Sequence, residues 1–169
     1  MVLRRSATPT SSMGGFHTAL LTHSMDMSVA FYSLFGFTPV HKFKTSGARA
    51  AWLQSNFLEG NLEVIEIPSH MIQSTPKKCN NLEEKGAPGL YHISFDVTAS
   101  CLTLSTLLQE LDAQSRLKFN KTLRILEPPA QRMLGSLTCE ICFLSDPNNI
   151  PVELIRRISQ LAHPMEPDW

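Results

Sequence analysis

The sequence predicts an α+β fold built from two copies of a βαβββ module, and three observations carry that prediction. An aromatic residue followed by histidine opens an apolar strand twice, as Phe16-His17 and as Tyr91-His92. Each opening strand precedes one segment with helical spacing and three further strand-like segments. Each module then closes on a strand with a glutamate among branched aliphatic residues, Glu66 in VIEI and Glu153 in PVEL. We place the modules at residues 16–68 and 89–157, between an N-terminal tail (1–15) and a C-terminal tail (158–169).

The first module begins with an alternating strand over residues 16–22. Ser24 is placed to cap a helix, whose apolar residues recur at helical spacing until Gly36 supplies the stop. Three short strands follow, TPVHKFKT, ARAAWLQS and LEVIEIP. The Ser46-Gly47 dipeptide predicts the turn between the first two of them, because glycine tolerates the backbone angles of a tight turn.

The second module repeats this order after a polar stretch. Residues 69–89 are rich in proline and glycine, which is typical of a surface loop or linker. The strand GLYHISFDV restarts the pattern, and Ser100 is placed to cap a helix with leucines at helical spacing. Three strands follow, TLRILEP, LTCEICFLS and IPVELIRR. Each half-sheet has an apolar face, so the two must pack against each other or against another copy of the chain.

Composition narrows the classes of partner. The 169 residues include fifteen basic and fifteen acidic side chains, so the net charge is zero. Nucleic acid and anionic membranes attract basic faces, and no apolar run approaches the roughly 18 residues of a membrane span. We therefore expect neither nucleic acid nor membrane as partner, and zero net charge is compatible with a small-molecule ligand.

The cysteines and the N-terminal residues indicate the subcellular compartment. Four unevenly spaced cysteines favour reduced thiols and a cytoplasmic protein. Cys139 and Cys142 form a CxxC on a strand, where residues three apart point to opposite faces, so we expect neither a redox pair nor a shared metal. Residues 1–15 contain arginine, serine and threonine without an acid, and organellar targeting is the alternative.

A set of four residues at matching places suggests chemistry. His17 and Glu66 in the first module correspond to His92 and Glu153 in the second. One strand histidine is more often a hydrogen-bonded core residue, and one strand glutamate usually faces water. Two carboxylates in one low-dielectric site cannot both stay ionised without a cation. The mixed nitrogen and oxygen set therefore favours a divalent ion such as Mn, Fe, Co, Ni or Zn.

In these stretches the sequence resembles the vicinal oxygen chelate superfamily, and within it most closely glyoxalase I (lactoylglutathione lyase). The resemblance is carried by FHTALLT, FYSLFGF, LEVIEIP, LYHISFDV and FLSDPNNIPVELIRR. It implies paired βαβββ modules whose mixed sheets curl into half-barrels, and a homodimer that completes the site. It also implies that His17, Glu66, His92 and Glu153 hold the metal.

The resemblance implies a reaction as well. In glyoxalase I the metal stabilises an enediolate of the methylglyoxal–glutathione hemithioacetal, a step of methylglyoxal detoxification. By matching, Glu153 is the preferred general base and Glu66 its partner. The chain departs from the family at Leu21, where glyoxalase I usually has an arginine that binds glutathione, and in the DPNN turn, which lacks the usual glycine.

Other residues and functions remain open from sequence. Arg49, a charge in an apolar strand that should have a partner, and Arg124 are candidates to bind the substrate, and Trp52 could line its pocket. Glutathione is a possible co-substrate. The alternatives are a metal-binding relative of epimerase or dioxygenase type with another vicinal-oxygen substrate, and a non-catalytic binding protein of bleomycin-resistance type.

Overall fold

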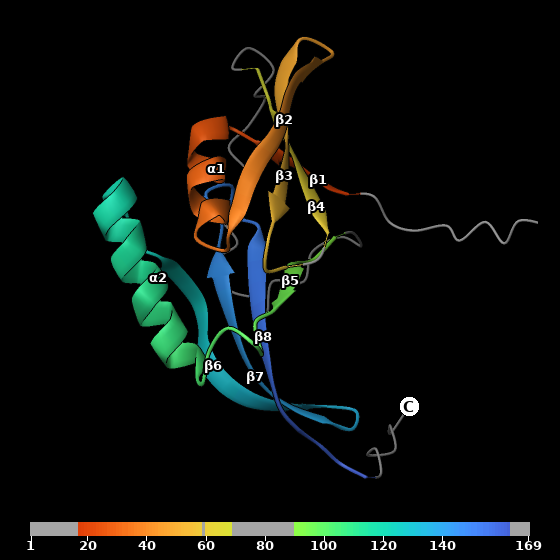
Figure 1. Ribbon diagram of the computed structural model, residues 1–169, viewed down its shortest axis with the longest axis vertical. Coiled ribbons are helices and arrows are strands. Elements are labelled where there is room, and N and C mark those ends of the chain that lie inside the picture. The colour runs from red at the N-terminus through yellow and green to blue at the C-terminus, as the bar shows by residue number, and fades with distance from the viewer. Residues whose placement is uncertain (1–16, 59, 69–89, 163–169) are drawn as a thin grey trace, which may run out of the picture.

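Two βαβββ modules follow one another along the chain, as the sequence predicts (Figure 1). The computed structural model describes residues 17–58, 60–68 and 90–162, so the expected N-terminal tail, the 69–89 linker and the last residues of the C-terminal tail lie outside the described residues. The elements are β1 (Thr18–Thr22), α1 (Met25–Ser33), β2 (Phe37–Thr45), β3 (Ala48–Ser55), β4 (Asn61–Glu66), β5 (Ile93–Asp96), α2 (Leu104–Phe119), β6 (Arg124–Leu134), β7 (Leu137–Ser145) and β8 (Pro151–Gln160).

Each module forms its own mixed four-stranded sheet, with the orders β1-β4-β3-β2 and β5-β8-β7-β6. The first strand of each module runs parallel to the last, and the remaining pairs are antiparallel. The α+β class and the duplication are thereby confirmed. The strand β8 continues to Gln160, three residues past the expected end of the second module.

Local chemistry explains where the elements begin and end. Ser24 caps α1 as expected, its side chain accepting a hydrogen bond from the Met27 N–H. The expectation that Ser100 caps α2 is wrong, because Ser100 closes a turn onto Val97 and Thr103 is the cap. The tight turn between β2 and β3 has positive φ at both Ser46 and Gly47, the geometry of a two-residue hairpin.

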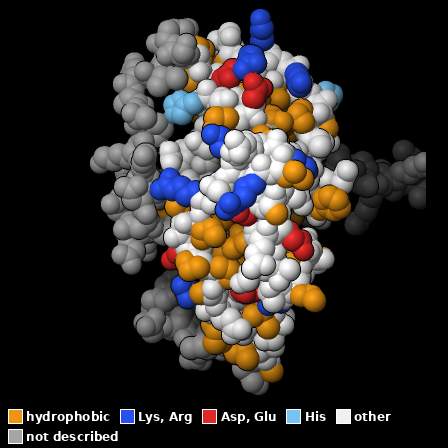
Figure 2. All heavy atoms as spheres, turned by 90° about the vertical axis from the view of Figure 1, so that its left-hand side faces the viewer, with side chains coloured by type: hydrophobic (Ala, Val, Ile, Leu, Met, Phe, Trp, Pro, Cys, Tyr) orange, Lys and Arg blue, Asp and Glu red, His pale blue; other side chains and the backbone are white. Residues whose placement is uncertain are grey.

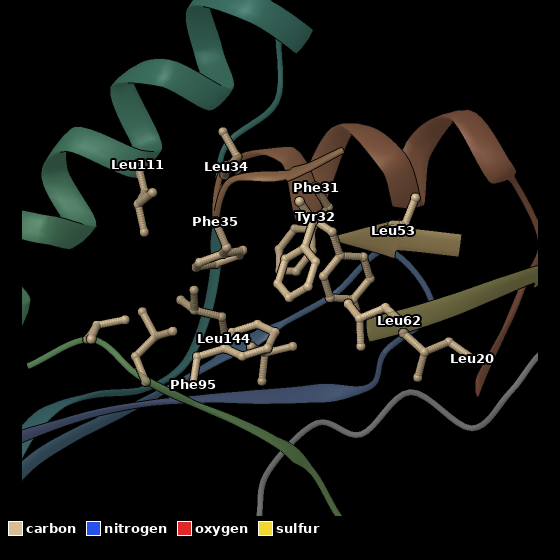
Figure 3. Packing of buried hydrophobic residues seen from close by; sticks show 14 of the residues in the cluster. Leu20, Phe31, Tyr32, Leu34, Phe35, Leu53, Leu62, Phe95, Leu111 and Leu144 are labelled. Carbon is tan, nitrogen blue, oxygen red and sulfur yellow. The ribbon is translucent and has the colours of Figure 1, made fainter. Parts of the chain in front are cut away.

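A single apolar core joins the two modules (Figure 3). The rings of Phe35 and Phe37 from the first module each lie 5.5 Å from the ring of Phe95 in β5. Phe31 packs edge-on against Tyr32, at 5.2 Å between ring centroids. Aromatic contacts of this kind add to the burial of the rings themselves, so the modules pack as one body.

A buried polar network crosses the same junction. The Tyr32 hydroxyl of α1 donates to Asp146 in the β7–β8 turn at 3.2 Å. Asn148, two residues on, donates to Ser28 at 3.1 Å and accepts from Thr22 at 2.9 Å. Burial raises the pKa of Asp146, and burial together with that carboxylate raises the pKa of Tyr32. The β7–β8 turn thus ties the second module to β1 and α1.

The helices cover only one face of the sheets. Both lie to the left of the strands in Figure 1. In β4, Leu62 and Val64 belong to the core, and Val152 and Leu154 do so in β8. Side chains alternate along a strand, so the residues between them lie on the opposite side, called here the open face. Among the described residues, neither helix has the length and apolar character needed to cross a membrane.

The two cysteines of the CxxC lie on opposite faces, as expected. Cys142 is part of the main core beneath the helices. Cys139 belongs to a smaller cluster on the open face of the second sheet, with Ile141 and Phe143. Both are free thiols, and the spacing is that of a strand rather than of a redox or metal motif.

Candidate functional site

A histidine and a glutamate meet on the open face of the first sheet. His17 Nε2 lies 3.0 Å from Glu63 Oε2. Glu63 of β4 is the register partner of Ala19 in β1, and Ala19 lies two residues after His17. The side chains of His17 and Glu63 are 30% and 14% exposed to solvent, so both are partly buried but accessible to a ligand.

The second sheet carries an equivalent pair. His92 Nε2 lies 3.4 Å from Glu153 Oε2, and the two side chains keep 31% and 13% of their exposure. Glu153 is the register partner of Ser94, which again lies two residues beyond the histidine. The same strand offset and the same burial make the His17–Glu63 and His92–Glu153 pairs structural equivalents. The other ring nitrogen of His92, Nδ1, is buried and has no hydrogen-bond partner among the described residues.

The structure does not bring Glu66, the second expected metal ligand, beside His17. Glu66 stands three residues after Glu63, and an odd step along a strand reverses the direction of the side chain. Its carboxylate accepts hydrogen bonds from Arg49 at 2.5 and 2.7 Å and from the Met25 N–H at 3.1 Å. The Arg49 hydrogen bond, helped by that of Met25, lowers the pKa of Glu66 to about 2. Such a weakly basic carboxylate suits a structural role better than proton transfer near neutral pH.

An aromatic ring adjoins each His–Glu pair. Trp52 in β3 is the register partner of Glu63, and its ring centroid lies 6.3 Å from that of His17. Phe143 in β7 is the register partner of Glu153, and its ring lies 5.5 Å from that of His92 in an edge-on contact. Each open face therefore presents a histidine, a glutamate and an aromatic ring in adjacent strands.

Of the three residues expected to bind substrate, only Trp52 lies beside a His–Glu pair. Arg49 lies on the helix side with Glu66. Arg124, at the start of β6, donates to Asn149 at 2.9 Å and borders a cavity of about 470 Å³ between the two helices. Figure 2 views this helix side, where hydrophobic side chains are exposed among lysines and arginines. Both cavities there, of about 470 and 620 Å³, are lined in part by α1 and by Phe119, and the His–Glu pairs lie on the other face.

The donor atoms suit a divalent ion in type and spacing. Two donors about 2.1 Å from one ion lie about 3.0 Å apart at a right angle and about 3.4 Å apart at the tetrahedral angle. The two Nε2–Oε2 distances are 3.0 and 3.4 Å. In the described part of one chain, however, no three histidine, cysteine, aspartate or glutamate side chains converge on one point. Each pair by itself provides two possible donor atoms.

A short sequence signal for Glu63 is visible once the register is known. Residues 62–65 read LEVI and residues 152–155 read VELI. Aligning these four residues gives Glu63 as the counterpart of Glu153, whereas the VIEI segment drew attention to Glu66. Phe143 had no such signal, because a phenylalanine in a strand is more often only a core residue.

Comparison with known structures identifies the architecture. No protein-family model matches the sequence, and no curated protein has a significantly similar sequence. A glyoxylase/bleomycin resistance protein/dioxygenase domain from Frankia sp. EAN1pec superposes with a TM-score of 0.58 at 18% identity, covering 88% of this chain and all of that one (100%).

Two glyoxalase proteins give similar values. A glyoxalase family protein from Enterococcus faecalis has a TM-score of 0.60 at 18% identity, over 85% of this chain and 97% of that one. The trypanothione-dependent glyoxalase I of Leishmania major has a TM-score of 0.54 at 19% identity, over 86% and 87%. At these identities the likeness concerns the fold, which agrees with the resemblance read from the sequence. The chain therefore has the fold of the glyoxalase and glyoxylase/bleomycin resistance protein/dioxygenase structures.

Proposed function

We propose that the protein is a metal-dependent lyase of glyoxalase I type that isomerises the adduct of a 2-oxoaldehyde with a thiol such as glutathione. One observation carries the proposal, namely that two His–Glu pairs occupy register-equivalent places on the open faces of two duplicated sheets. Two half-sites that hold one ligand require such a recurrence of strand offset and burial in both modules.

The complete site requires both half-sites, and we propose that two copies of the chain supply them. The His17–Glu63 pair of one copy would face the His92–Glu153 pair of the other, which gives two imidazole and two carboxylate donors. This set suits Ni, Co, Zn, Mn or Fe and leaves positions for substrate oxygens. In the proposed ligand set Glu63 takes the place that the sequence gave to Glu66.

The metal ion and the residues around it have different roles in the proposed reaction. A bound divalent ion supplies stabilisation of the negative charge that develops on two adjacent substrate oxygens. Glu153 acts as the general base, which takes the proton from the carbon that bears sulfur and hydroxyl and returns it to the adjacent carbonyl carbon. The hydroxyl proton moves to the neighbouring oxygen, so that the hemithioacetal becomes a 2-hydroxy thioester. Trp52 and Phe143 border the pairs and would limit access of water.

A different vicinal-oxygen substrate is the second candidate. Leu21, where glyoxalase I usually has its glutathione-binding arginine, is 59% exposed. It alternates in β1 with Leu20 and Thr22, which are buried, so it lies on the open face. An aliphatic side chain there favours a substrate that is less anionic than a glutathione adduct, processed by the same pair of half-sites.

Metal analysis of matched variants tests the proposal. The purified protein should bind about one divalent ion per chain by elemental analysis and form lactoylglutathione when Ni, Co or Zn is added. Glu63→Gln should lose the metal, whereas Glu66→Gln, three residues away on the same strand and outside the proposed donor set, should lose only part of its metal affinity. Metal bound without turnover would favour the second candidate. No metal in the unmodified protein, or equal metal in both variants, would contradict the proposed site.

A further inference from the structure

An arginine–glutamate ion pair lies behind each half-site. In the first sheet Arg49 of β3 binds Glu66 of β4, with the shorter N–O distance at 2.5 Å. In the second sheet Arg156 of β8 binds Glu140 of β7 at 2.8 Å, and these two residues are register partners. Neither module's pair includes a proposed metal ligand.

The positions of these ion pairs relative to the half-sites are the same in both modules. Arg49 precedes Trp52 by three residues, and Glu66 follows Glu63 by three. Glu140 precedes Phe143 by three residues, and Arg156 follows Glu153 by three. Because three is an odd step, each ion pair lies on the helix side of the two strands whose open face carries the glutamate and the aromatic ring.

Each ion pair also holds the start of the neighbouring helix. Glu66 accepts a hydrogen bond at 3.1 Å from the N–H of Met25, the first residue of α1. Glu140 accepts one at 3.0 Å from the N–H of Leu104, the first residue of α2. A carboxylate at this place satisfies a free backbone donor and complements the positive end of the helix dipole. Glu66 and Glu140 therefore have the same role, since each accepts a hydrogen bond from the first residue of a helix.

The strands that carry the arginine and the glutamate are reversed between the two modules. The carboxylate comes from β4, the strand of the site glutamate, in the first module, but from β7, the strand of the aromatic ring, in the second. What the two modules have in common is the pair and its contact with the helix, rather than a residue type at one position.

We propose that Arg49–Glu66 and Glu140–Arg156 are two copies of a strand clamp, which positions the half-site residues by fixing two adjacent strands to the start of a helix. The link to metal binding rests on the proposed function, whereas the link to local geometry does not. The clamp residues are positioning residues, since they act through Glu63, Trp52, Phe143 and Glu153. The Arg49 side chain is 58% exposed, and ion pairs at exposed sites contribute little to overall stability, so the expected effect of breaking the first clamp is on local order at the half-site.

A charge exchange within the first module tests the clamp. Arg49→Glu alone places two carboxylates against each other, and Glu66→Arg alone places two cations there. The double substitution reproduces the polarity that the second module has by nature. Arg116→Glu is the control, because it breaks the exposed Arg116–Asp112 pair on α2, at 2.7 Å, with a similar charge change outside both clamps.

Two readouts follow the half-site in the folded protein. The first is the nuclear Overhauser contact by NMR between the rings of Trp52 and Phe43, whose centroids lie 5.3 Å apart. The second is metal affinity, which should fall about tenfold in each single variant, the lower range for residues that support metal ligands. We expect both readouts to be lost or weakened in the single variants, restored in the double variant and unchanged in Arg116→Glu. The milder Arg49→Gln should show a smaller loss in the same direction.

Two results would overturn the clamp, namely single variants with unchanged ring contacts, or a double variant that does not recover. Absence of metal binding by the unmodified protein would contradict the proposed function, and the ring contacts, which need no metal, would still decide for or against the clamp.

Discussion

Replacing Tyr32 with phenylalanine tests whether the polar junction holds the modules together. Tyr32 is fully buried, and its hydroxyl donates to Asp146 at 3.2 Å. The same carboxylate accepts from the N–H groups of Asn148 and Ile150, each at 2.8 Å. A hydrogen bond to a charged group contributes about 1.5–3 kcal/mol. For a protein of this size we expect Tyr32→Phe to lower Tm by about 3–12 °C near neutral pH.

The pH dependence of that loss follows from Asp146. Burial raises its pKa above the ordinary 3.8, so the stability linked to its protonation is present at acid pH and is lost as pH rises through the raised value. The Tyr32 hydroxyl is among the groups that lower this pKa, so Tyr32→Phe raises it further. The difference in Tm between the two proteins should therefore be largest near neutral pH and shrink as pH falls through the two raised pKa values, both of which lie above 3.8.

Thermal denaturation followed by circular dichroism measures both effects. Ser33→Ala is the control on the same helix, because it removes only a 2.8 Å hydrogen bond from its hydroxyl to the Ala30 carbonyl. Its smaller loss should not vary with pH. An unchanged Tm in Tyr32→Phe, or a loss of equal size at acid and neutral pH, would refute the assigned role of the junction.

Three further predictions follow from the site and its strands. The Arg49 hydrogen bond lowers the pKa of Glu66 from 4.5 to about 2. Any difference in the free energy of unfolding between Glu66→Gln and the unmodified protein, measured by denaturant titration, should therefore be present above pH 4.5 and fade as pH falls toward 2. Cys139 and Cys142 are fully buried, and burial also raises the pKa of Cys142 to about 12. Both thiols should therefore resist alkylation until the protein unfolds, and fast modification of the native state would contradict this burial. Trp52→Ala should raise KM for the hemithioacetal by about 2- to 10-fold without loss of metal, because an aromatic contact contributes about 0.5–1.5 kcal/mol of binding free energy. Loss of metal in this variant would instead show that Trp52 supports the metal ligands.

The fold could be predicted because its signals are local. Ser24 caps its helix and Ser46-Gly47 makes its turn through their own side chain and backbone, and neither needs a distant partner. Ser100 was misassigned because two hydroxyl residues stand close together, and only the packing of Leu104, which is fully buried, selects Thr103.

The site could be predicted only in part because it depends on strand register. Both Glu63 and Glu66 sit among branched aliphatic residues, and one odd step separates the open face from the helix side. Only the pairing of Ala19 with Glu63 decides which of them meets His17. The partner expected for Arg49 exists, but it is Glu66, the residue that the sequence assigned to the metal. Register and long-range ion pairs involve strands that are distant in sequence, so the pattern of one strand does not contain them.

Metal binding by mixed copies of the chain tests the central proposal most directly. One copy carries His17→Ala with Glu63→Gln, and the other carries His92→Ala with Glu153→Gln, so that neither alone retains a complete set of four donors. If half-sites from two copies combine, each dimer of one copy of each variant has one intact site out of two. Equal amounts that exchange freely place about half of the dimers in this mixed form, so the mixture should regain about a quarter of the metal bound by the unmodified protein. Mixed protein that binds no more metal than the separate variants would contradict a site built across two copies.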